Sequence, residues 1–211
     1  MKAKSPIKLA LYQNLRTYQR EKNLKLKRIF DLLLALLASF VLFLPILVVA
    51  LMVKLTSKGA VLYWSDRVGK DNKIFKMPKF RSMKINTPAV ATHLLSDPNS
   101  VLTPIGGFLR KSSLDELPQL WCILKGNMSF VGPRPALFNQ DDLIELRTRQ
   151  GVDQLMPGLT GWAQVNGRDE LPIPQKVALD TEYLNRRGFW FDIYILWRTF
   201  VKVVKSDGVS H

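Results

Sequence analysis

An acidic pair flanked by basic residues is the most informative feature of this 211-residue chain. Arg110 and Lys111 precede Asp115 and Glu116, and Ser113 with Glu116 fits a capping box that predicts the start of a helix. In one interpretation, the two acids lie in the first turn only because acidic side chains are favoured there. In the functional interpretation, the same helix N-terminus binds phosphate. It then places a nucleophilic carboxylate, a ligand for a divalent cation and anion-binding side chains within two turns.

Three further segments carry basic or turn-forming residues. Lys79 and Arg81 alternate along a predicted strand and would share one face, where they bind an anion or face solvent. Arg134 stands between two prolines, which restrict the backbone around a phosphate-binding guanidinium or simply form a turn. Residues 157–168 are typical of turn, apolar strand and turn, with neither P-loop spacing nor a Rossmann glycine pattern.

Composition limits the chemistry that is open to these residues. The single cysteine excludes an internal disulfide and a multi-cysteine metal site, and two histidines leave little for a histidine-built metal site or a catalytic triad. Catalysis must therefore rely on carboxylates, basic side chains or hydroxyls. The length allows one ordinary domain with one extra element. A net charge of +14 predicts an anionic partner: nucleic acid, anionic lipid or a phosphorylated substrate.

The excess positive charge surrounds one long apolar run, residues 32–53. As a helix this run would be about 33 Å long, enough to cross a bilayer core. A buried core helix of this length is unusual, and the late start and missing cleavage site disfavour a signal peptide. Nucleic-acid binding is disfavoured because the charge flanks this run and no base-stacking motif is present. An anionic membrane lipid is the partner that this distribution favours.

Pro45, near the middle of the apolar run, argues against a simple crossing because proline interrupts a helix. Both flanks of the run are basic, which places both ends at the cytoplasmic face. A helix that enters, bends at Pro45 and returns satisfies both observations, and a kinked spanning helix is the alternative. Residues 1–28 form either a basic amphipathic segment on anionic lipid or a disordered basic tail.

The rest of the chain has the composition of a compact α+β domain. The pattern predicts strands over 60–64 and 74–83, a turn over 66–72 and a loop-like stretch over 84–104. It predicts helices over 113–124, 138–150, 174–186 and 191–204. The aromatic residues of 189–198 indicate a helix that lies at a membrane interface, packs on the domain core, or does both with different faces.

These segments, in this order, resemble the bacterial sugar transferase family, the monotopic polyprenyl-phosphate phosphoglycosyl transferases of the small single-domain type. The resemblance covers about residues 25–205. The motifs that carry it are Lys27–Asp31, Thr56–Gly59, Lys79–Met83, Leu109–Gln119, Val131–Pro135 and Pro157–Arg168. In some small members a serine precedes the proline of the apolar helix, whereas Leu44 precedes it here.

The resemblance implies an enzyme that moves a sugar 1-phosphate from a UDP-sugar to undecaprenyl phosphate, releasing UMP. The reaction would pass through a covalent phosphoglycosyl-aspartate and initiate assembly of an exopolysaccharide, capsule, O-antigen or glycoprotein glycan. By motif position, Asp115 is the nucleophile and Glu116 helps to hold Mg²⁺. The residues implied to bind substrate phosphate or line the site are Lys79, Arg81, Arg110, Arg134 and Asp180. The sugar and the oligomeric state stay open.

The resemblance also implies the architecture and the location. A re-entrant membrane helix over residues 29–54, broken at Pro45, follows the basic segment 1–28. A cytoplasmic catalytic domain with interfacial amphipathic helices covers residues 55–211, at the inner membrane of a bacterium. The competing class is a membrane-anchored adaptor without activity, and the intact acidic pair of Asp115 and Glu116 argues against it.

Overall fold

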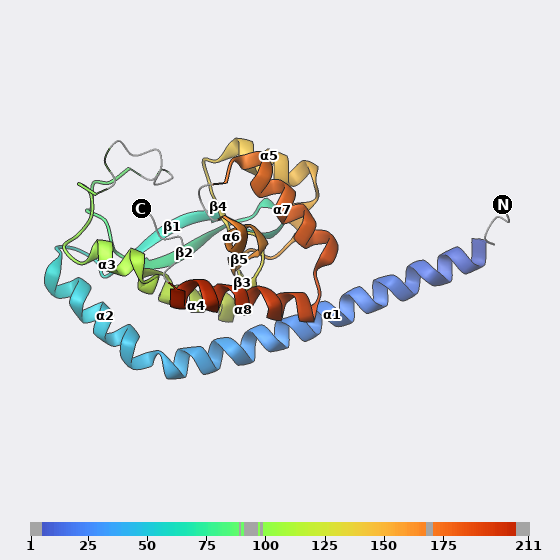
Figure 1. Ribbon diagram of the computed structural model, residues 1–211, viewed down its shortest axis with the longest axis horizontal. Helices are drawn as coiled ribbons and strands as arrows, with labels where there is room; N and C mark the ends of the chain where they lie inside the picture. The colour runs from blue at the N-terminus through green and yellow to red at the C-terminus, as the bar shows by residue number, and fades with distance from the viewer. Residues whose placement is uncertain (1–5, 89, 91–96, 98, 168–170, 206–211) are drawn as a thin grey trace.

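The computed structural model describes residues 6–88, 90, 97, 99–167 and 171–205, with side chains from residue 23 to residue 203. Helices combine with two small sheets, in agreement with the predicted α+β class (Figure 1). Arg168 lies outside the described residues, as do the side chains on which the amphipathic prediction for 1–28 depends. The backbone of helix α1, Pro6–Val41, continues without interruption past residue 28.

Two helices, α1 and α2 (Phe43–Thr56), form the arms of an open V along one side of the molecule (Figure 1). The arms meet at a bend of 62°. The sequence predicted a bend at Pro45, but the structure has it at Leu42. Proline has no N–H for the carbonyl four residues before it, and its ring clashes with that carbonyl. The helix changes direction next to Val41, the residue whose carbonyl Pro45 leaves without an α-helical partner.

Large apolar side chains are exposed on both arms of the V. Leu33 is 64% exposed, Phe40 82% and Leu55 75%, so the two helices do not form the buried core of a globular domain. No single described helix is long and apolar enough to cross a membrane. The bent pair Asn23–Val41 and Phe43–Thr56 together has the length and composition to do so.

Each arm buries a narrow stripe against the domain that follows. Ala35 of α1 is fully buried in a cluster that includes Ile123. Val53 of α2 is fully buried beside Phe80 and Leu109. The inner stripe of the V is thus part of the protein core while its outer surface stays exposed, so the arms are fixed to the domain by packing.

The two sheets are small. The first has the order β2-β1-β4, with all pairs antiparallel, and the second pairs β3 with β5 in parallel. The strands are β1 Leu62–Val68, β2 Ile74–Phe80, β3 Ser129–Val131, β4 Ala136–Leu137 and β5 Gly158–Thr160. The predicted strands at 60–64 and 74–83 exist with shifted ends, and the turn between them is shorter, around the 3₁₀ helix η1 (Lys70–Asn72). Pro78 is tolerated because β2 is an edge strand.

The remaining helices surround these sheets. The predicted helix 138–150 is shorter than expected, whereas 174–186 and 191–204 match closely. Their bounds are α3 Gly106–Lys111, η3 (3₁₀) Leu114–Gln119, α4 Leu120–Lys125, α5 Asp141–Arg149, η4 (3₁₀) Val152–Gln154, α6 Trp162–Asn166, α7 Ile173–Arg186 and α8 Phe189–Lys205.

The predicted capping box at Ser113 is wrong. Ser113 has φ 58°, in the left-handed region, and its side chain caps no N–H group. The predicted helix 113–124 is also divided, into η3 and α4. Pro118 has no N–H to donate to an α-helical bond, which accounts for the 3₁₀ geometry of η3 before the α-helical turns begin.

Glycines allow β3 and β5 to approach each other closely. A Cβ on Gly132 would lie 2.3 Å from the carbonyl oxygen of Met156, and one on Gly161 would lie 2.1 Å from the carbonyl oxygen of Gly132. Both neighbours are backbone atoms that cannot move aside. The absence of side chains therefore brings the segment after β3 directly against the segment around β5.

Helix α8 packs on the domain core with one face, and the predicted membrane contact of its other face stays a prediction. Ile195 is fully buried and Asp192 is 6% exposed, whereas Trp190 is 80% and Trp197 59% exposed. The helix therefore packs on the domain with one side and presents aromatic rings with the other.

We predict that Pro45→Ala straightens the V, because alanine restores the hydrogen bond to the carbonyl of Val41. Spin labels on cysteines at exposed Leu33 and Leu55 report the change in a Cys122→Ser background. The bend of 62° corresponds to about 28 Å between the labelled positions, and a straight helix to about 33 Å. Pulsed electron spin resonance in lipid nanodiscs measures the distance. An unchanged distance would show that packing on the domain, and not the proline, sets the bend.

Candidate active site

The acidic pair lies on η3, directly after a reversal of the chain at Ser113. The left-handed conformation of Ser113 ends α3 and redirects the backbone, and the N–H of Glu116 donates to the carbonyl of Ser113 at 3.2 Å. Asp115 is 7% exposed. A short 3₁₀ helix thus presents two adjacent carboxylates in a largely buried position.

Glu116 joins three segments through one oxygen. Lys79 Nζ, from β2, donates to Glu116 Oε1 at 2.7 Å, and Arg134 Nη2, from the turn after β3, donates to the same oxygen at 2.9 Å. All three side chains are largely buried or half-buried. The sequence predicted that these residues belong to one site, and the structure brings them into direct contact.

The two carboxyl groups have very different pKa values. Burial raises the pKa of Asp115 to about 6, with a further rise from the charge of Glu116, against the lowering effects of Lys79, Arg110 and Arg134. Burial also opposes ionisation of Glu116, but Arg134 and Lys79 outweigh it and lower the pKa of that carboxyl below its usual range. Glu116 is therefore permanently ionised, while Asp115 titrates near neutral pH. Such a division is typical of paired catalytic acids.

Arg110 and Arg81 have different positions relative to this pair. Arg110, on α3, is close enough for its charge to lower the pKa of Asp115. Arg81 is 8% exposed and donates to the carbonyl oxygen of Ser57 at 3.1 Å and to its hydroxyl at 2.9 Å. β2 ends at Phe80, although the N–H of Arg81 still donates to the carbonyl of Val61 at 3.0 Å, so the predicted common face of Lys79 and Arg81 stays a prediction. Arg81 holds the chain that leaves α2.

Asp180 contacts the site through an arginine that the sequence analysis missed. Arg147 donates to Asp180 Oδ2 through Nε at 2.9 Å and Nη2 at 2.7 Å, and its Nη1 donates to the carbonyl oxygen of Arg134 at 2.8 Å. Asp180 is 1% exposed and Arg147 8%. The available signal was the position of Arg147 four residues after the buried Leu143 on α5, which places it on the apolar side of that helix. Asp180 thus holds Arg147, and Arg147 in turn holds the backbone of Arg134.

The carboxylates of Asp115 and Glu116 supply part of the ligand set of the expected Mg²⁺. Mg²⁺ is usually held by one or two carboxylates together with substrate phosphates and water. Asp115 and Glu116 supply two adjacent carboxylates, and the described residues contain no group of three or more acidic, His or Cys side chains that could hold a metal alone. The residues therefore suit an ion that phosphate oxygens help to bind.

The arrangement favours chemistry on a phosphorylated substrate. A buried carboxylate that ionises near neutral pH can act as a nucleophile. Three cations around it neutralise phosphate charge, and phosphoryl transfer depends mainly on positioning and charge neutralisation.

Comparison with known proteins gives a consistent result. The sequence model of the family described as bacterial sugar transferase matches residues 22–206. A UDP-galactose-lipid carrier transferase of Erwinia amylovora is 40% identical over 202 residues, covering 87% of this chain and 41% of the relative. A UDP-glucose:undecaprenyl-phosphate glucose-1-phosphate transferase of Escherichia coli is 40% identical over 193 residues, covering 85% and 40%. An exopolysaccharide production protein of Rhizobium meliloti is 38% identical over 202 residues, covering 86% and 87%. The chain thus spans about two fifths of the first two relatives and most of the third.

We predict that Asp115→Asn stabilises the protein at pH 8 and not at pH 4. The pKa of Asp115 is raised to about 6 in the folded state, so its stabilising contribution is complete below pH 4 and is lost as the pH rises through 6. A neutral amide avoids that loss. The rise in the pKa of Asp115 from 3.8 to about 6 corresponds to about 3 kcal/mol in the free energy of unfolding. Thermal unfolding in detergent at both pH values measures the effect, with the exposed Asp141→Asn as control. A lower melting temperature of Asp115→Asn at pH 8 would contradict the raised pKa.

Proposed function

Because the chain belongs to the bacterial sugar transferase family, we propose that it transfers a sugar 1-phosphate from a UDP-sugar to undecaprenyl phosphate and releases UMP. The observation that carries the proposal is the buried Asp115, with a pKa raised to about 6, beside an ionised Glu116 that Lys79 and Arg134 hold in place. The activities named for the relatives from Erwinia and Escherichia agree with this reaction.

In the first half-reaction, a carboxylate oxygen of Asp115 attacks the phosphorus that carries the sugar. A bond forms between that oxygen and phosphorus, the bond from phosphorus to the bridging oxygen breaks, and UMP leaves with the electron pair. In the second half-reaction, a phosphate oxygen of the lipid attacks the same phosphorus and releases the carboxylate of Asp115. Lys79, Arg110 and Arg134 neutralise phosphate charge in both steps.

Mg²⁺ is the cofactor that we propose, with Glu116 as the protein ligand next to the nucleophile. Bound Mg²⁺ would neutralise negative charge on the diphosphate of the donor. Glu116 suits this role because Arg134 and Lys79 lower its pKa below the usual range, which keeps it ionised at neutral pH. Lys79 and Arg134 fix its orientation through Oε1.

We propose that the V of α1 and α2 is re-entrant, with the domain on the cytoplasmic face of the bacterial inner membrane. The exposed apolar surface of both arms, the bend at Leu42 and the basic flanks of the apolar run support this placement. The exposed aromatic rings of α8 suit the headgroup layer. UDP-sugars are made on that side, and the lipid phosphate lies at the same depth as an interfacial domain.

We predict that Asp115→Asn abolishes UMP release, because an amide cannot attack phosphorus, and that Glu116→Gln lowers it about tenfold or more. UMP is measured with undecaprenyl phosphate and a panel of UDP-sugars that includes glucose, galactose and N-acetylated amino sugars. The wild-type rate should fall below pH 6, where Asp115 is protonated. Without lipid, the intact protein should gain the mass of one sugar phosphate. Wild-type protein that releases no UMP from any donor would favour a non-enzymatic adaptor.

We predict that both ends of the chain face the cytoplasm. Single cysteines near positions 10 and 205, in a Cys122→Ser background, should resist an impermeant thiol reagent on intact spheroplasts and react after lysis. The basic flanks and the bend generate this expectation. Reaction of the amino-terminal cysteine from outside would demonstrate a spanning helix.

A further inference from the structure

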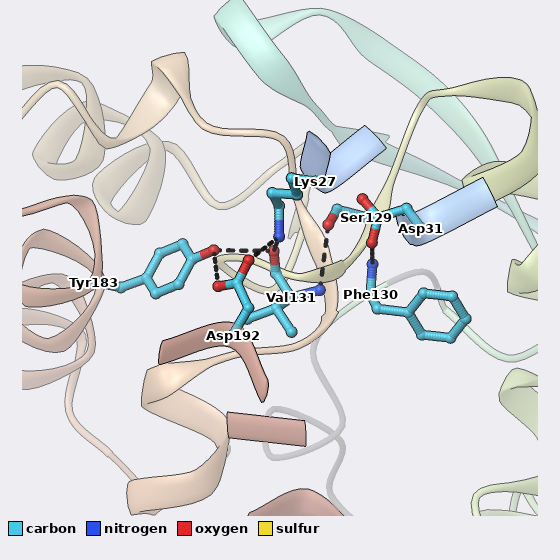
Figure 2. Close-up of polar contacts among 7 residues, drawn as sticks. All are labelled: Lys27, Asp31, Ser129, Phe130, Val131, Tyr183 and Asp192. Carbon is cyan, nitrogen blue, oxygen red and sulfur yellow. Dashed lines mark hydrogen bonds and ion pairs between the residues drawn. The ribbon is translucent and has the colours of Figure 1, made fainter. Parts of the chain in front are cut away.

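A cluster of polar groups joins α1 to the domain that carries the acidic pair (Figure 2). This junction cluster consists of Lys27 and Asp31 from α1, Tyr183 from α7, Asp192 from α8 and the backbone of β3. Lys27 Nζ donates to Asp192 Oδ2 at 2.6 Å, and the hydroxyl of Tyr183 donates to Asp192 Oδ1 at 2.8 Å. Figure 2 shows these three side chains converging from three helices.

The junction cluster is hydrogen-bonded to the backbone of β3. The carbonyl oxygen of Val131 accepts from Lys27 Nζ at 3.0 Å and from the hydroxyl of Tyr183 at 3.2 Å. The N–H of Phe130 donates to Asp31 Oδ1 at 3.2 Å. Two successive residues of this three-residue strand are therefore hydrogen-bonded to side chains of α1.

The polar groups of the junction cluster are buried, so each needs a partner within the protein. Asp31 and Tyr183 are each 3% exposed, and the side chain of Asp192 is 8% exposed. Without Lys27, Asp192 would be a buried carboxylate with no cation at hydrogen-bonding distance among the described residues. Such a group is costly, and the cost is relieved by protonation of Asp192 or by a rearrangement of the groups around it. Val131, which shares Lys27 with Asp192, is part of those surroundings.

The end of β3 leads directly to Arg134. The turn is stiff, because prolines at 133 and 135 restrict its backbone. It is also tied to β5, since the N–H of Gly132 donates to the carbonyl of Thr160 and the N–H of Gly158 donates to the carbonyl of Pro133, both at 2.9 Å. The position of Arg134 therefore depends on the paired strands β3 and β5 as a unit, and Val131 belongs to that unit through its pairing with Thr160.

We propose that Lys27, through its ion pair with Asp192, is a positioning residue for Arg134 and thereby for the donor half-reaction. A side chain on a helix proposed to lie in the membrane thus controls a step whose substrate is water-soluble. The inference rests on the proposed function, and it assigns to Lys27 a role beyond its contribution to the positive flank. Lys27 acts through Val131 and does not contact the substrate.

The test is a lipid-free single turnover in which UMP release is followed after UDP-sugar is added to the full-length enzyme. The amplitude reports the fraction of active enzyme, and the rate constant reports the position of Arg134. Lys27→Met should lower the rate constant about tenfold, while Lys27→Arg, which keeps the cation, should recover most of it. A purely structural role of Lys27 would lower the amplitude and leave the rate constant unchanged, which would overturn the proposal.

Arg28→Gln is the matched control. Arg28 follows Lys27 on α1, but it donates to the carbonyls of Ile123 at 2.6 Å and Leu124 at 2.9 Å, at the end of α4. The variant removes contacts between α1 and the domain without touching β3, so its rate constant should stay within about twofold of wild type. An equal loss of rate in Arg28→Gln would mean that general loosening of α1 is responsible, and the proposal would fail.

A double-variant cycle tests the route through Arg134. Arg134→Gln should slow the single turnover by itself, and adding Lys27→Met to it should cost less than about twofold more, because the same contact is already lost. Independent losses that multiply would contradict the proposal.

Hydrogen exchange over residues 129–137 gives a readout that needs no substrate. Exchange should be faster in Lys27→Met than in wild type and unchanged in Arg28→Gln. Equal exchange in Lys27→Met and wild type would overturn the positioning role. If wild-type enzyme releases no UMP from any donor, the proposed function fails, and the exchange experiment still decides whether Lys27 positions β3.

Discussion

A single oxygen atom, Oε1 of Glu116, is the point at which the separate parts of the site meet. Lys79 comes from an edge strand, Arg134 from a turn between two prolines, and Glu116 from a 3₁₀ helix between them in the sequence. Two cations on one acid offset the cost of burying it. The neighbouring Asp115 has a pKa raised to about 6, chiefly by burial and against the lowering effect of the same two cations. The chemistry proposed for the site depends on this division of labour between two adjacent carboxylates.

The α+β class was predicted from the pattern of strands and helices, and the residues of the acidic site were named from the family resemblance; the structure brings Lys79, Glu116 and Arg134 into contact. Arg81 and Ser113 show where such reasoning stops. Arg81 was expected to bind substrate phosphate, but its side chain is buried and donates to Ser57. Ser113 matches a capping pattern, yet it has a left-handed backbone because the chain must reverse between α3 and η3. Both outcomes depend on contacts that local spacing does not encode.

The basic residues before the apolar run illustrate the same limit at longer range. Lys27 and Arg28 were interpreted as positive charge beside a membrane and as part of a family motif, but both side chains bond to segments about a hundred residues further along the chain. Arg147 was not considered, although it donates hydrogen bonds to the carboxylate of Asp180 and to the carbonyl oxygen of Arg134. Several of their partners are backbone carbonyls, which residue identity does not reveal. The predicted bend of the apolar run exists, one turn before Pro45.

The glycine contact between the segments around β3 and β5 has a consequence for how this protein can diversify. A Cβ on Gly132 or Gly161 would collide with backbone atoms, so no second substitution nearby can make room for it. The backbone next to Arg134 is therefore fixed by these two glycines. A change in the preferred sugar donor has to arise from side chains that reach the site from other elements. A mutagenesis library aimed at new sugars gains nothing at these two positions and can hold both constant.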